Sequence, residues 1–439
     1  MPDLVLGIDT GGTYTDGVIL EQNTRKILKT AKTLTTKPNL ANGILATLDT
    51  LLPDNLQDIK LVAISTTLAT NAIAEGNRRP VGLFLIGYDQ GLIEKFNLGS
   101  EFATSHFHYV QGGHNLYGHP QAPLDLDFLI EKATTLKDQV EAFAISGYFS
   151  PFNSNHEERA FQAITKATNR PVVLGHELAS KLNSIERATT ATLNASLLSP
   201  LRSFINAMEQ SLRERGVNAP LMVVRGDGAL VSGELAKDRP VETVHSGPAA
   251  SAIGGRFLSQ TDHAVVVDIG GTTTDIAILE NGQVTIREEG TSVGKYNTAV
   301  RAAHIHSLGL GGDSRITLSV EDQIIIGPER VTPISYLAHS NAAVAKDLKK
   351  LSVHRQKPFS LQNLEYWYLL REPSPAMRNS RTRDVLNLLE KGPMAIPDIL
   401  EKLDVFHPVQ FEGVALLREE IIGRSGLTPT DLLHVTGEF

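Results

Sequence analysis

Short apolar runs alternate with longer amphipathic segments along the first 180 residues of the chain. The runs are bounded by polar or glycine-rich turns, as buried strands are. They are Leu4–Ile8, Val18–Leu20, Leu61–Ile64, Val81–Ile86 and Ala142–Ile145. Ser65–Ala74 opens with hydroxyl residues that are typical of a helix cap. This alternation predicts a layered α/β domain.

The same kind of pattern continues through the second half of the chain. Glu177–Gln210 predicts a long helix that contains Pro200, and Leu221–Val224 and Ala264–Asp268 predict two further strands. Asp384–Leu403 predicts two helices joined by a turn at Gly392-Pro393. We therefore expect three segments. Residues 1–180 and 181–345 form two α/β lobes, and residues 346–439 form a small, mainly helical and winged-helix-like piece, cut short at Phe439.

Composition narrows the class of protein. Of the 439 residues, 41% are hydrophobic and 21% are charged, as in ordinary globular proteins, and the formal charge is −8. This balance argues against a nucleic-acid partner, and we interpret the lysines and arginines of residues 346–383 as a solvated helical face. No run is apolar enough for a membrane helix, and no signal peptide is evident, so we expect a cytoplasmic protein. Because cysteine is absent, disulfides, cysteine zinc sites and thiol nucleophiles are excluded.

One octapeptide pattern occurs twice. Asp9-Thr-Gly-Gly-Thr-Tyr-Thr-Asp16 is repeated as Asp268-Ile-Gly-Gly-Thr-Thr-Thr-Asp275, 259 residues further on (268 − 9), and each copy lies between two predicted strands. The recurrence indicates two halves of a duplicated design. It differs from a P-loop and from a dinucleotide fingerprint. The alternative for either copy alone is an ordinary Gly-Gly-Thr β-turn.

Residue types in the two loops suit phosphate binding by β-hairpins. Glycines let backbone amides approach phosphate oxygens, hydroxyls add donors, and carboxylates hold magnesium. The glycines are Gly11, Gly12, Gly270 and Gly271, and the hydroxyl residues are Thr13, Thr15, Thr272 and Thr273. We expect Asp9 and Asp268, at the ends of central strands, to hold Mg²⁺, and Asp16 and Asp275 to lie near the γ-phosphate. Two such hairpins facing each other would clamp the triphosphate of ATP.

A third glycine-rich segment, Ser307–Ser314, follows the second loop. Its Gly311 and Gly312 resemble, in order and spacing, the glycine pair that packs on the adenosine in the actin-like ATPase superfamily. The resemblance implies two actin-like, ribonuclease H-like ATPase lobes with duplicated phosphate hairpins.

Longer segments make the resemblance more specific. Ser65-Thr-Thr-Leu-Ala-Thr-Asn-Ala72 is similar to a segment of the hydantoinase/oxoprolinase family, with Ser65 in place of a glycine. Glu186–Ala195 and Thr243–Ala250 also fit this family in order. The chain thus resembles a hydantoinase A type subunit from about residue 4 to about residue 315. The family's usual Arg-Pro-x-Tyr-Asp-Leu stretch is not evident after Ala103.

The resemblance implies ATP-dependent opening of a cyclic amide, such as a hydantoin or the lactam 5-oxoproline. This chain would transfer the γ-phosphoryl group to the amide oxygen, with Asp9, Asp16, Asp268 and Asp275 as the catalytic carboxylates. A hydantoinase B-type subunit would then hydrolyse the activated amide. Whether the chain forms a homo-oligomer is left open. Two alternatives remain: a small-molecule kinase of the same superfamily, and an ATP-driven reactivating or regulatory scaffold.

Other chemistry-bearing residues carry weaker signals. His304 and His306 share one strand face, but two imidazoles do not complete a zinc site. His245 stands beside Ser246, yet neighbours in sequence seldom meet as base and nucleophile. Asp227 follows a strand, where it reaches a ligand or simply closes a turn.

Overall fold

The computed structural model describes residues 3–11, 14–35, 40–53, 55–319, 321–353, 361–373 and 381–437. The chain divides into two compact units, 1–266 with 276–305, and 267–275 with 306–439. The first hairpin therefore belongs to the first unit and the second hairpin to the second. Neither expected boundary, after residue 180 or after residue 345, coincides with a limit of these units. The threefold division stays a prediction.

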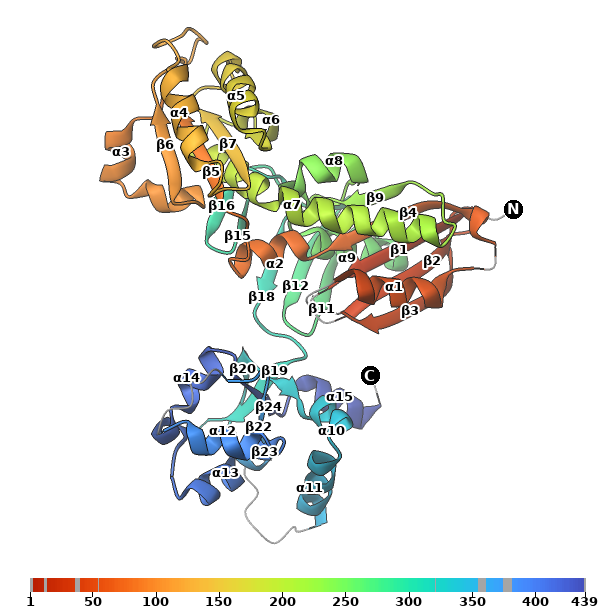
Figure 1. The fold of residues 1–439 in the computed structure, drawn as a ribbon. Helices are drawn as coiled ribbons and strands as arrows, with labels where there is room; N and C mark the ends of the chain where they lie inside the picture. The colour runs from red at the N-terminus through yellow and green to blue at the C-terminus, as the bar shows by residue number, and fades with distance from the viewer. Residues whose placement is uncertain are drawn as a thin grey trace. The chain divides into compact units, whose positions relative to one another are not determined.

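A six-stranded sheet forms the centre of the first unit (Figure 1). Its order is β10-β9-β4-β1-β2-β3; β1, β2 and β3 are antiparallel, while β4 and β9 run parallel to β1. The strands are β1 (Leu4–Thr10), β2 (Tyr14–Glu21), β3 (Lys26–Leu34), β4 (Ile59–Thr66), β9 (Leu221–Val224) and β10 (Leu230–Ser232).

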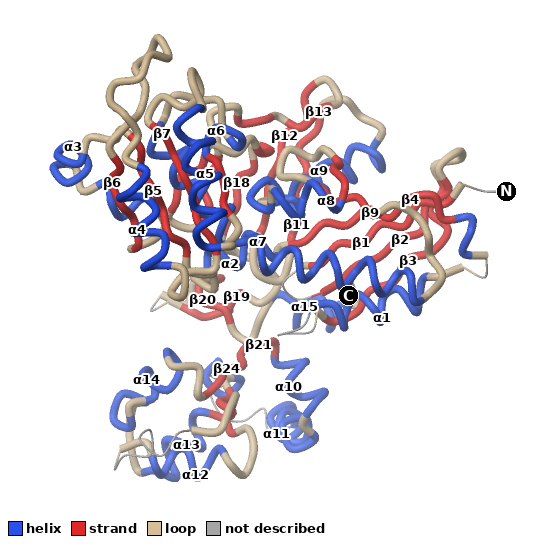
Figure 2. The backbone as a smooth tube through the Cα atoms, turned by 45° about the horizontal axis from the view of Figure 1, so that its top comes forward, coloured by secondary structure: helices blue, strands red, loops and turns tan. Residues whose placement is uncertain are grey.

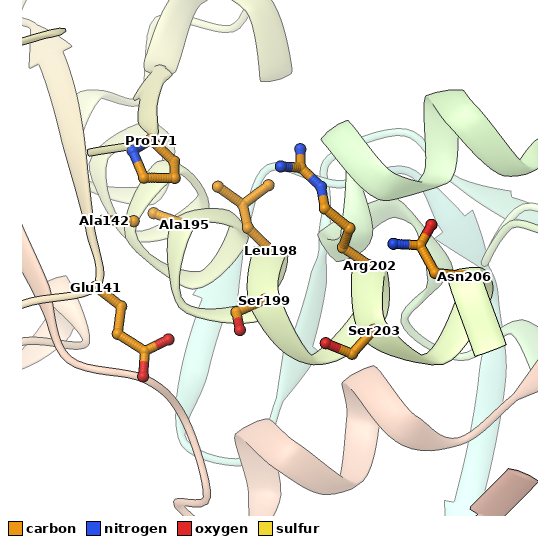
Figure 3. A pocket seen from close by; sticks show the side chains of 9 residues that line it. All are labelled: Glu141, Ala142, Pro171, Ala195, Leu198, Ser199, Arg202, Ser203 and Asn206. Atoms are coloured by element: carbon orange, nitrogen blue, oxygen red, sulfur yellow. The ribbon is translucent and has the colours of Figure 1, made fainter. Parts of the chain in front are cut away.

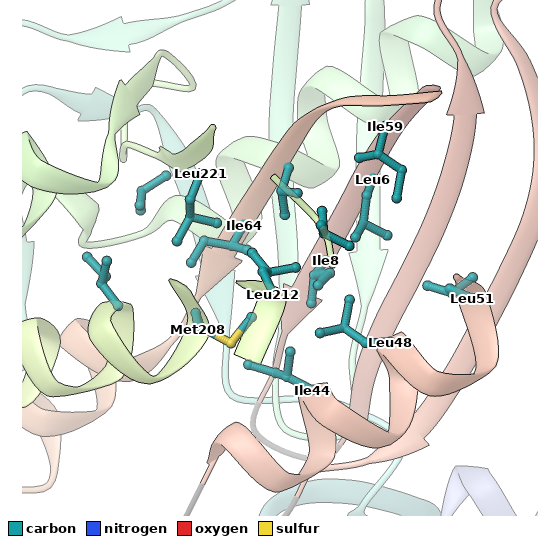
Figure 4. Packing of buried hydrophobic residues seen from close by; sticks show 14 of the residues in the cluster. Leu6, Ile8, Ile44, Leu48, Leu51, Ile59, Ile64, Met208, Leu212 and Leu221 are labelled. Atoms are coloured by element: carbon teal, nitrogen blue, oxygen red, sulfur yellow. The ribbon is translucent and has the colours of Figure 1, made fainter. Parts of the chain in front are cut away.

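Alternation of burial along β1 gives the sheet two different faces. Leu4, Leu6 and Ile8 are buried against α1 (Leu40–Leu51) and α7 (Ser184–Glu214), which supply Ile44, Leu48, Met208 and Leu212 to the same core (Figure 4). The tube view shows both helices along this sheet (Figure 2). Asp9 belongs to the opposite face, because successive strand residues point to opposite sides. Helix α9 (Ser246–Ser259) contacts β4 and β9.

A second sheet is inserted between β4 and β9. It is entirely parallel, in the order β6-β5-β7-β8, and follows the short helix α2 (Leu68–Ala74). Its strands are β5 (Val81–Ile86), β6 (His106–Val110), β7 (Ala142–Gly147) and β8 (Val172–Leu174). Its helices are α3 (Gln90–Lys95), α4 (Leu126–Leu136), α5 (Asn155–Thr168) and α6 (Gly175–Leu178). Strand–helix alternation was predicted, but its division between two sheets was not, since hydrophobic pattern does not say which strands pair.

Buried charges hold the loops at the carboxyl edge of this inserted sheet. The Glu157 carboxylate accepts from the backbone N–H of Gly147 (2.6 Å) and from Nδ1 of His176 (2.6 Å). The fully buried Arg187 guanidinium donates to the carbonyl oxygens of Gly147, Tyr148 and Lys181 at 2.6–2.7 Å. The hydrogen bond that His176 donates to Glu157 raises the pKa of His176, and burial opposes this effect. The loops after β7 and β8 are thereby tied to α5 and α7.

Helix α7 runs through Pro200 without ending there. Proline has no N–H, so the carbonyl of Ser196, four residues earlier, lacks its usual helical donor. The backbone N–H of Arg79, just before the inserted sheet, donates to that carbonyl at 3.3 Å. This exchange of partners accommodates the proline and attaches the inserted sheet to the middle of α7.

The strands after α9 are short. β11 (Ala264–Ile269) neighbours β12 (Thr274–Glu280), which also pairs with β13 (Gln283–Val284) and β18 (Ile305–Leu308). The two-stranded pieces are β14 (Ile286–Arg287) with β17 (Ala302–Ala303), and β15 (Thr291–Val293) with β16 (Tyr296–Thr298). Asp9 ends a central strand as predicted, but the expectation that Asp268 also does so is wrong. Within the described residues β11 pairs with β12 alone, so it is an edge strand.

A four-stranded sheet surrounded by helices forms most of the second unit. The sheet has the order β21-β24-β22-β23, and a separate ribbon pairs β19 with β20. The strands are β19 (Ser314–Leu318), β20 (Ile324–Arg330), β21 (Thr332–Pro333), β22 (Tyr366–Leu369), β23 (Met394–Ala395) and β24 (Ile422–Gly426). The helices are α10 (Ile334–Ser340), α11 (Ala342–Val353), α12 (Arg383–Leu389), α13 (Ile396–Leu403), α14 (Gly413–Arg418) and α15 (Pro429–Thr436). Helix α8 (Gly233–Asp238) belongs to the first unit. Helices α12 and α13 flank the predicted turn at Gly392, and Trp367 is buried with them in one core.

Asp431 connects two helices of this unit. Its carboxylate accepts from Thr428 in the capping box of α15 and from the backbone N–H groups of Ile334 and Ser335 at the start of α10. Throughout the part of the chain that is described, no helix is both long enough and apolar enough to cross a membrane.

Candidate functional site: the two glycine hairpins

The parallel strands of the six-stranded sheet bring several polar segments to one edge. β1, β4 and β9 run in the same direction, so their carboxyl ends lie at the same edge. The segments that follow are the first hairpin, the Thr66–Asn71 stretch and the Arg225–Gly228 loop. Ligands of open α/β sheets bind at the carboxyl ends of strands.

The first hairpin places two of the predicted carboxylates opposite each other. Asp9 on β1 and Asp16 on β2 are register partners, so their side chains share one face of the sheet. The N–H of Gly11 donates to the carbonyl of Tyr14 (2.9 Å), which closes the turn. Asp16 also forms an ion pair with Lys32 (3.2 Å). The predicted residues Gly12 and Thr13 lie outside the described residues.

Thr15, a predicted phosphate donor, lies on the other face of the hairpin. Its side chain is fully buried, and its hydroxyl is 3.1 Å from the hydroxyl of Thr35. Thr35 in turn donates to the carbonyl of Gly11 (3.0 Å). The Thr15 hydroxyl therefore supports the shape of the turn from its buried side.

Asp9 has neighbours that the loop pattern alone did not reveal. The hydroxyl of Ser65, its register partner on β4, donates to the Asp9 carboxylate. The N–H of Thr67 donates to the carbonyl of Thr10 (3.1 Å). A Cβ placed on Gly247 would lie 3.8 Å from Oδ1 of Asp9, so the first turn of α9 reaches this carboxylate. Ser65, Thr67 and Gly247 all lie in the family-like segments, which were the signal that could have identified them.

Ser246 attaches the start of α9 to the same edge. Its hydroxyl donates to the carbonyl of Thr66 (3.1 Å) and accepts from the N–H of Thr66 (3.3 Å). Ser246 is also buried. The hydroxyl thus has a structural role, in agreement with our rejection of a Ser246–His245 nucleophile and base.

The second hairpin repeats the turn of the first. The N–H of Gly270 donates to the carbonyl of Thr273 at 2.9 Å, and these positions correspond to Gly11 and Tyr14. Beyond the turn, the hydroxyl of Thr273 donates to Asp275 (3.3 Å). Asp268 stands at the end of β11, and Thr272 is partly exposed in the turn. The repeat seen in the sequence is therefore also a repeat of backbone hydrogen bonding.

The glycine pair Gly311 and Gly312 packs directly on this second hairpin. The N–H of Gly312 donates to the carbonyl of Gly270 (2.9 Å), and the N–H of Asp313 donates to that of Gly271 (2.8 Å). A Cβ on Gly311 would lie 2.6 Å from both hairpin carbonyl oxygens. Gly311 requires glycine because its backbone lies directly against that of the hairpin, whereas a Cβ on Gly312 would meet the side-chain hydroxyl of Thr430 at 2.6 Å.

Asp313 adds a carboxylate next to the second hairpin. It is 3.9 Å from the Arg330 guanidinium. Burial raises the pKa of the Asp313 carboxyl, Arg330 opposes this shift, and Asp431 reinforces it. Asp313 lies within the glycine-rich segment Ser307–Ser314, whose pattern predicts no role for it.

Replacing Gly311 by alanine is expected to destabilise the second unit by roughly 1–3 kcal/mol, because backbone atoms must move to admit the Cβ. Gly309→Ala is the matched control, since a Cβ there meets nothing within 4 Å. Thermal unfolding of both variants measures the difference. Equal transition temperatures for the two variants would show that the backbone around Gly311 admits a Cβ without loss of stability.

Other polar candidates lie apart from these hairpins or are already bonded. Asp227 accepts from the N–H of Ala229 (3.1 Å) and from Arg225 (2.9 Å), so it closes its own turn. His304 is bonded to Arg287 (2.8 Å). His114 is buried, and its ring lies tilted against that of His156, with 4.3 Å between the ring centroids; burial lowers the pKa of His156 to about 4. Within the described residues no three His, Asp or Glu side chains are grouped as a protein-only metal site.

The cavity drawn in Figure 3 is a separate feature. It has a volume of about 260 Å³ and lies between the middle of α7 and the amino ends of β7 and β8. Ser199, Arg202, Ser203 and Asn206 line it from one helix face, opposite Glu141. Its lining is made only of described residues and includes none of the predicted site residues.

The chain is similar in sequence to subunits of two curated enzymes. The chain is 27% identical to the caprolactamase subunit alpha of Pseudomonas jessenii over 74% of this chain and 50% of that protein. It is 25% identical to the acetophenone carboxylase gamma subunit of Aromatoleum aromaticum over 70% of this chain and 47% of that protein. The chain thus spans about half the length of these curated relatives.

A nucleotide-free structure of acetone carboxylase has the same mixed α/β fold. It covers 95% of this chain and 62% of its own, with a TM-score of 0.67 and 19% sequence identity. The model of the hydantoinase/oxoprolinase N-terminal region matches residues 5–168, and the hydantoinase/oxoprolinase model matches residues 187–345. Together they span both hairpins, the Thr66–Asn71 stretch and α9. The chain belongs to the hydantoinase/oxoprolinase family.

Proposed function

We propose that this chain is the ATP-dependent subunit of a cyclic amide hydrolase, which phosphorylates the carbonyl oxygen of a hydantoin or lactam. The observation that carries the proposal is the pair of hairpins with the same Gly N–H to carbonyl bond, each with carboxylates at the strand ends. Family membership and the caprolactamase relative support an amide as the substrate.

We further propose that the six-stranded sheet is a ribonuclease H-like lobe of an actin-like ATPase. Three antiparallel strands followed by two parallel ones, in the order β3-β2-β1-β4-β9, support this interpretation. The division into lobes 1–180 and 181–345 with a segment 346–439 remains part of the proposal. The proposal also includes a cytoplasmic location and a hydantoinase B-type partner, and it allows for a homo-oligomer.

The donor set fits magnesium and a triphosphate. Carboxylate oxygens are ligands that magnesium prefers, and it is commonly held by one or two carboxylates together with substrate phosphates. Asp9 and Asp268 would hold the ion, which when bound would neutralise phosphate charge. Asp16 and Asp275 would position the γ-phosphate. Phosphate oxygens would be contacted by the backbone of Gly11, Gly12, Gly270 and Gly271 and by the hydroxyls of Thr13, Thr272 and Thr273. Thr15 would support the first turn, and Gly311 and Gly312 would support the second hairpin.

The chemistry follows from the weak electrophilicity of an amide. Nitrogen donates electrons into the carbonyl group, so water attacks it slowly. Placing a phosphoryl group on the carbonyl oxygen withdraws those electrons and makes the carbon reactive. The residues of this chain would position the carbonyl oxygen and the γ-phosphate and stabilise the charge that develops between them.

A second candidate is the activation of a ketone for carboxylation. The carboxylase relative favours it, and the first step would again be phosphorylation of a carbonyl oxygen. A small-molecule kinase would release its phosphorylated product, and a regulatory scaffold would hydrolyse ATP without regard to carbonyl compounds.

The test is ATP turnover by the purified chain, with and without a B-type partner. Hydantoin, 5-oxoproline, caprolactam, acetone and acetophenone are added one at a time, and released phosphate and ring-opened product are measured. We expect a cyclic amide to stimulate turnover. Stimulation by ketones alone would favour the carboxylase alternative, and indifference to every compound would reject both.

A further inference from the structure

His245 is the histidine at the start of α9, next to the edge that carries Asp9. Its backbone is left-handed (φ 59°), which is uncommon for a residue with a side chain and is often found at functional sites. Its N–H donates to the hydroxyl of Thr70 (3.1 Å), in the helix that follows β4. Gly247, two residues on, approaches Oδ1 of Asp9. His245 is therefore held between two segments of the proposed ATP site.

The hydrogen bond of the His245 ring fixes the tautomer of its neutral form. Nε2 of His245 lies 3.1 Å from the carbonyl oxygen of Ser292. A carbonyl only accepts, so Nε2 carries the proton, and in the neutral ring Nδ1 has a free lone pair. Among the described residues no hydrogen-bond partner of Nδ1 is present, and the side chain is partly exposed. An imidazole oriented in this way through one nitrogen can act as a base through the other.

The carbonyl that orients the ring belongs to a hairpin that is attached to neighbouring segments at several points. Ser292 lies in the β15–β16 hairpin, where the hydroxyl of Thr298 donates to the carbonyl of Thr291 (2.8 Å). Tyr296 of this hairpin is buried, and its hydroxyl accepts from Arg78 (2.8 Å). The N–H of Ala299 donates to Thr190 of α7 (2.9 Å). This bracing limits the freedom of the imidazole, as a catalytic group requires.

The two kinds of relative share one chemical requirement. A lactam carries an N–H next to its carbonyl group, and acetone and acetophenone carry C–H bonds in that position. Removing this proton makes the carbonyl oxygen a nucleophile toward phosphorus. A base at the ATP edge would therefore serve either substrate class, and the carboxylates there are assigned to other tasks.

We propose that Nδ1 of His245 is the base that removes the proton next to the substrate carbonyl; this inference rests on the proposed function. The N–H bond of the amide breaks and its proton passes to Nδ1. The electron pair moves to the carbonyl oxygen, which forms a bond to the γ-phosphorus, while the bond from that phosphorus to the bridging oxygen breaks. The products are the O-phosphorylated imidate, ADP and an imidazolium. For a ketone the proton comes from carbon and the product is an enol phosphate.

The decisive variant is His245→Gln, whose side-chain amide can still donate to the carbonyl of Ser292 but is not basic. We expect carbonyl-stimulated ATP turnover to fall about 100-fold or more in kcat, which is the usual contribution of a general base. ATP affinity and the unfolding temperature should stay close to those of the native chain. His263→Gln, at an exposed position outside the proposed site, is the matched control and should retain full turnover.

His245→Gly supplies a second measurement that a purely structural role would not move. Glycine tolerates the left-handed backbone and leaves space for a small molecule. Added imidazole should restore part of the turnover, and substituted imidazoles should do so in the order of their basicity. Full turnover by His245→Gln, or loss of ATP affinity in both variants without rescue, would overturn the inference. If the native chain is stimulated by no carbonyl compound, the proposed function itself fails and this inference fails with it.

Discussion

Replacing Asp9 by asparagine is expected to lower carbonyl-stimulated ATP turnover by at least about 100-fold while the fold stays intact. The asparagine amide, at the end of β1, is nearly the same size and can still accept the hydrogen bond from Ser65 of β4. What it lacks is the negative charge that would hold magnesium at the first hairpin. The measurements are phosphate release and calorimetric titration with ATP and magnesium.

The matched control for this experiment is Asp49→Asn. Asp49 forms an exposed ion pair with Arg215 (2.7 Å) on the surface, so its loss should change stability by less than about 1 kcal/mol and leave turnover unchanged. Asp268→Asn repeats the test in the second hairpin. Native magnesium-dependent ATP affinity in either hairpin variant would refute the assignment of that carboxylate.

Replacing Arg187 by methionine is expected to destabilise the first unit by about 3–5 kcal/mol, because three carbonyl oxygens around this fully buried guanidinium then lose a charged donor. Those oxygens belong to Gly147, Tyr148 and Lys181, in the loops that Arg187 ties to α7. In a unit of this size the loss corresponds to a thermal midpoint lower by roughly 5–8 °C. Calorimetry is the suitable measurement, since it separates the transitions of the two units.

Arg202→Met provides the comparison on the same helix. The Arg202 guanidinium is exposed and forms a surface ion pair with Asp238 (3.2 Å), so its removal should cost less than about 1 kcal/mol. Arg187→Lys should lie between the two variants, because an ammonium group cannot reproduce the fork of donors. An unchanged midpoint for Arg187→Met would mean that water replaces the lost donors.

Local pattern was sufficient for the elements and the hairpins. The apolar runs predicted β1, β4, β5, β7 and β9, and the long helix through Pro200 is present as α7. The repeated octapeptide predicted two equivalent turns, and both are closed by the same backbone hydrogen bond. These features depend on residues that are close in sequence, so they can be recognised without knowing the fold.

Partners from distant segments could not be predicted in this way. Nothing in the loop pattern shows that Ser65 donates to Asp9, that the start of α9 reaches the same carboxylate, or that Gly311 packs on the second hairpin. The edge position of β11 and the separation of the inserted sheet from the six-stranded sheet could not be predicted either. Each depends on which strands pair, and strand pairing is decided by packing over the whole chain.

By itself, then, the sequence determined the family, the α/β elements, the duplicated hairpins and the carboxylates that they carry. Only the tertiary structure decided which of these residues meet. It paired Asp9 with Asp16 and Ser65, turned Thr15 to the buried side, and oriented His245 through Ser292. The physical reason is that residue type defines what a group can donate, accept or bind, whereas its partner is set by the register and packing of strands that lie far apart in the chain.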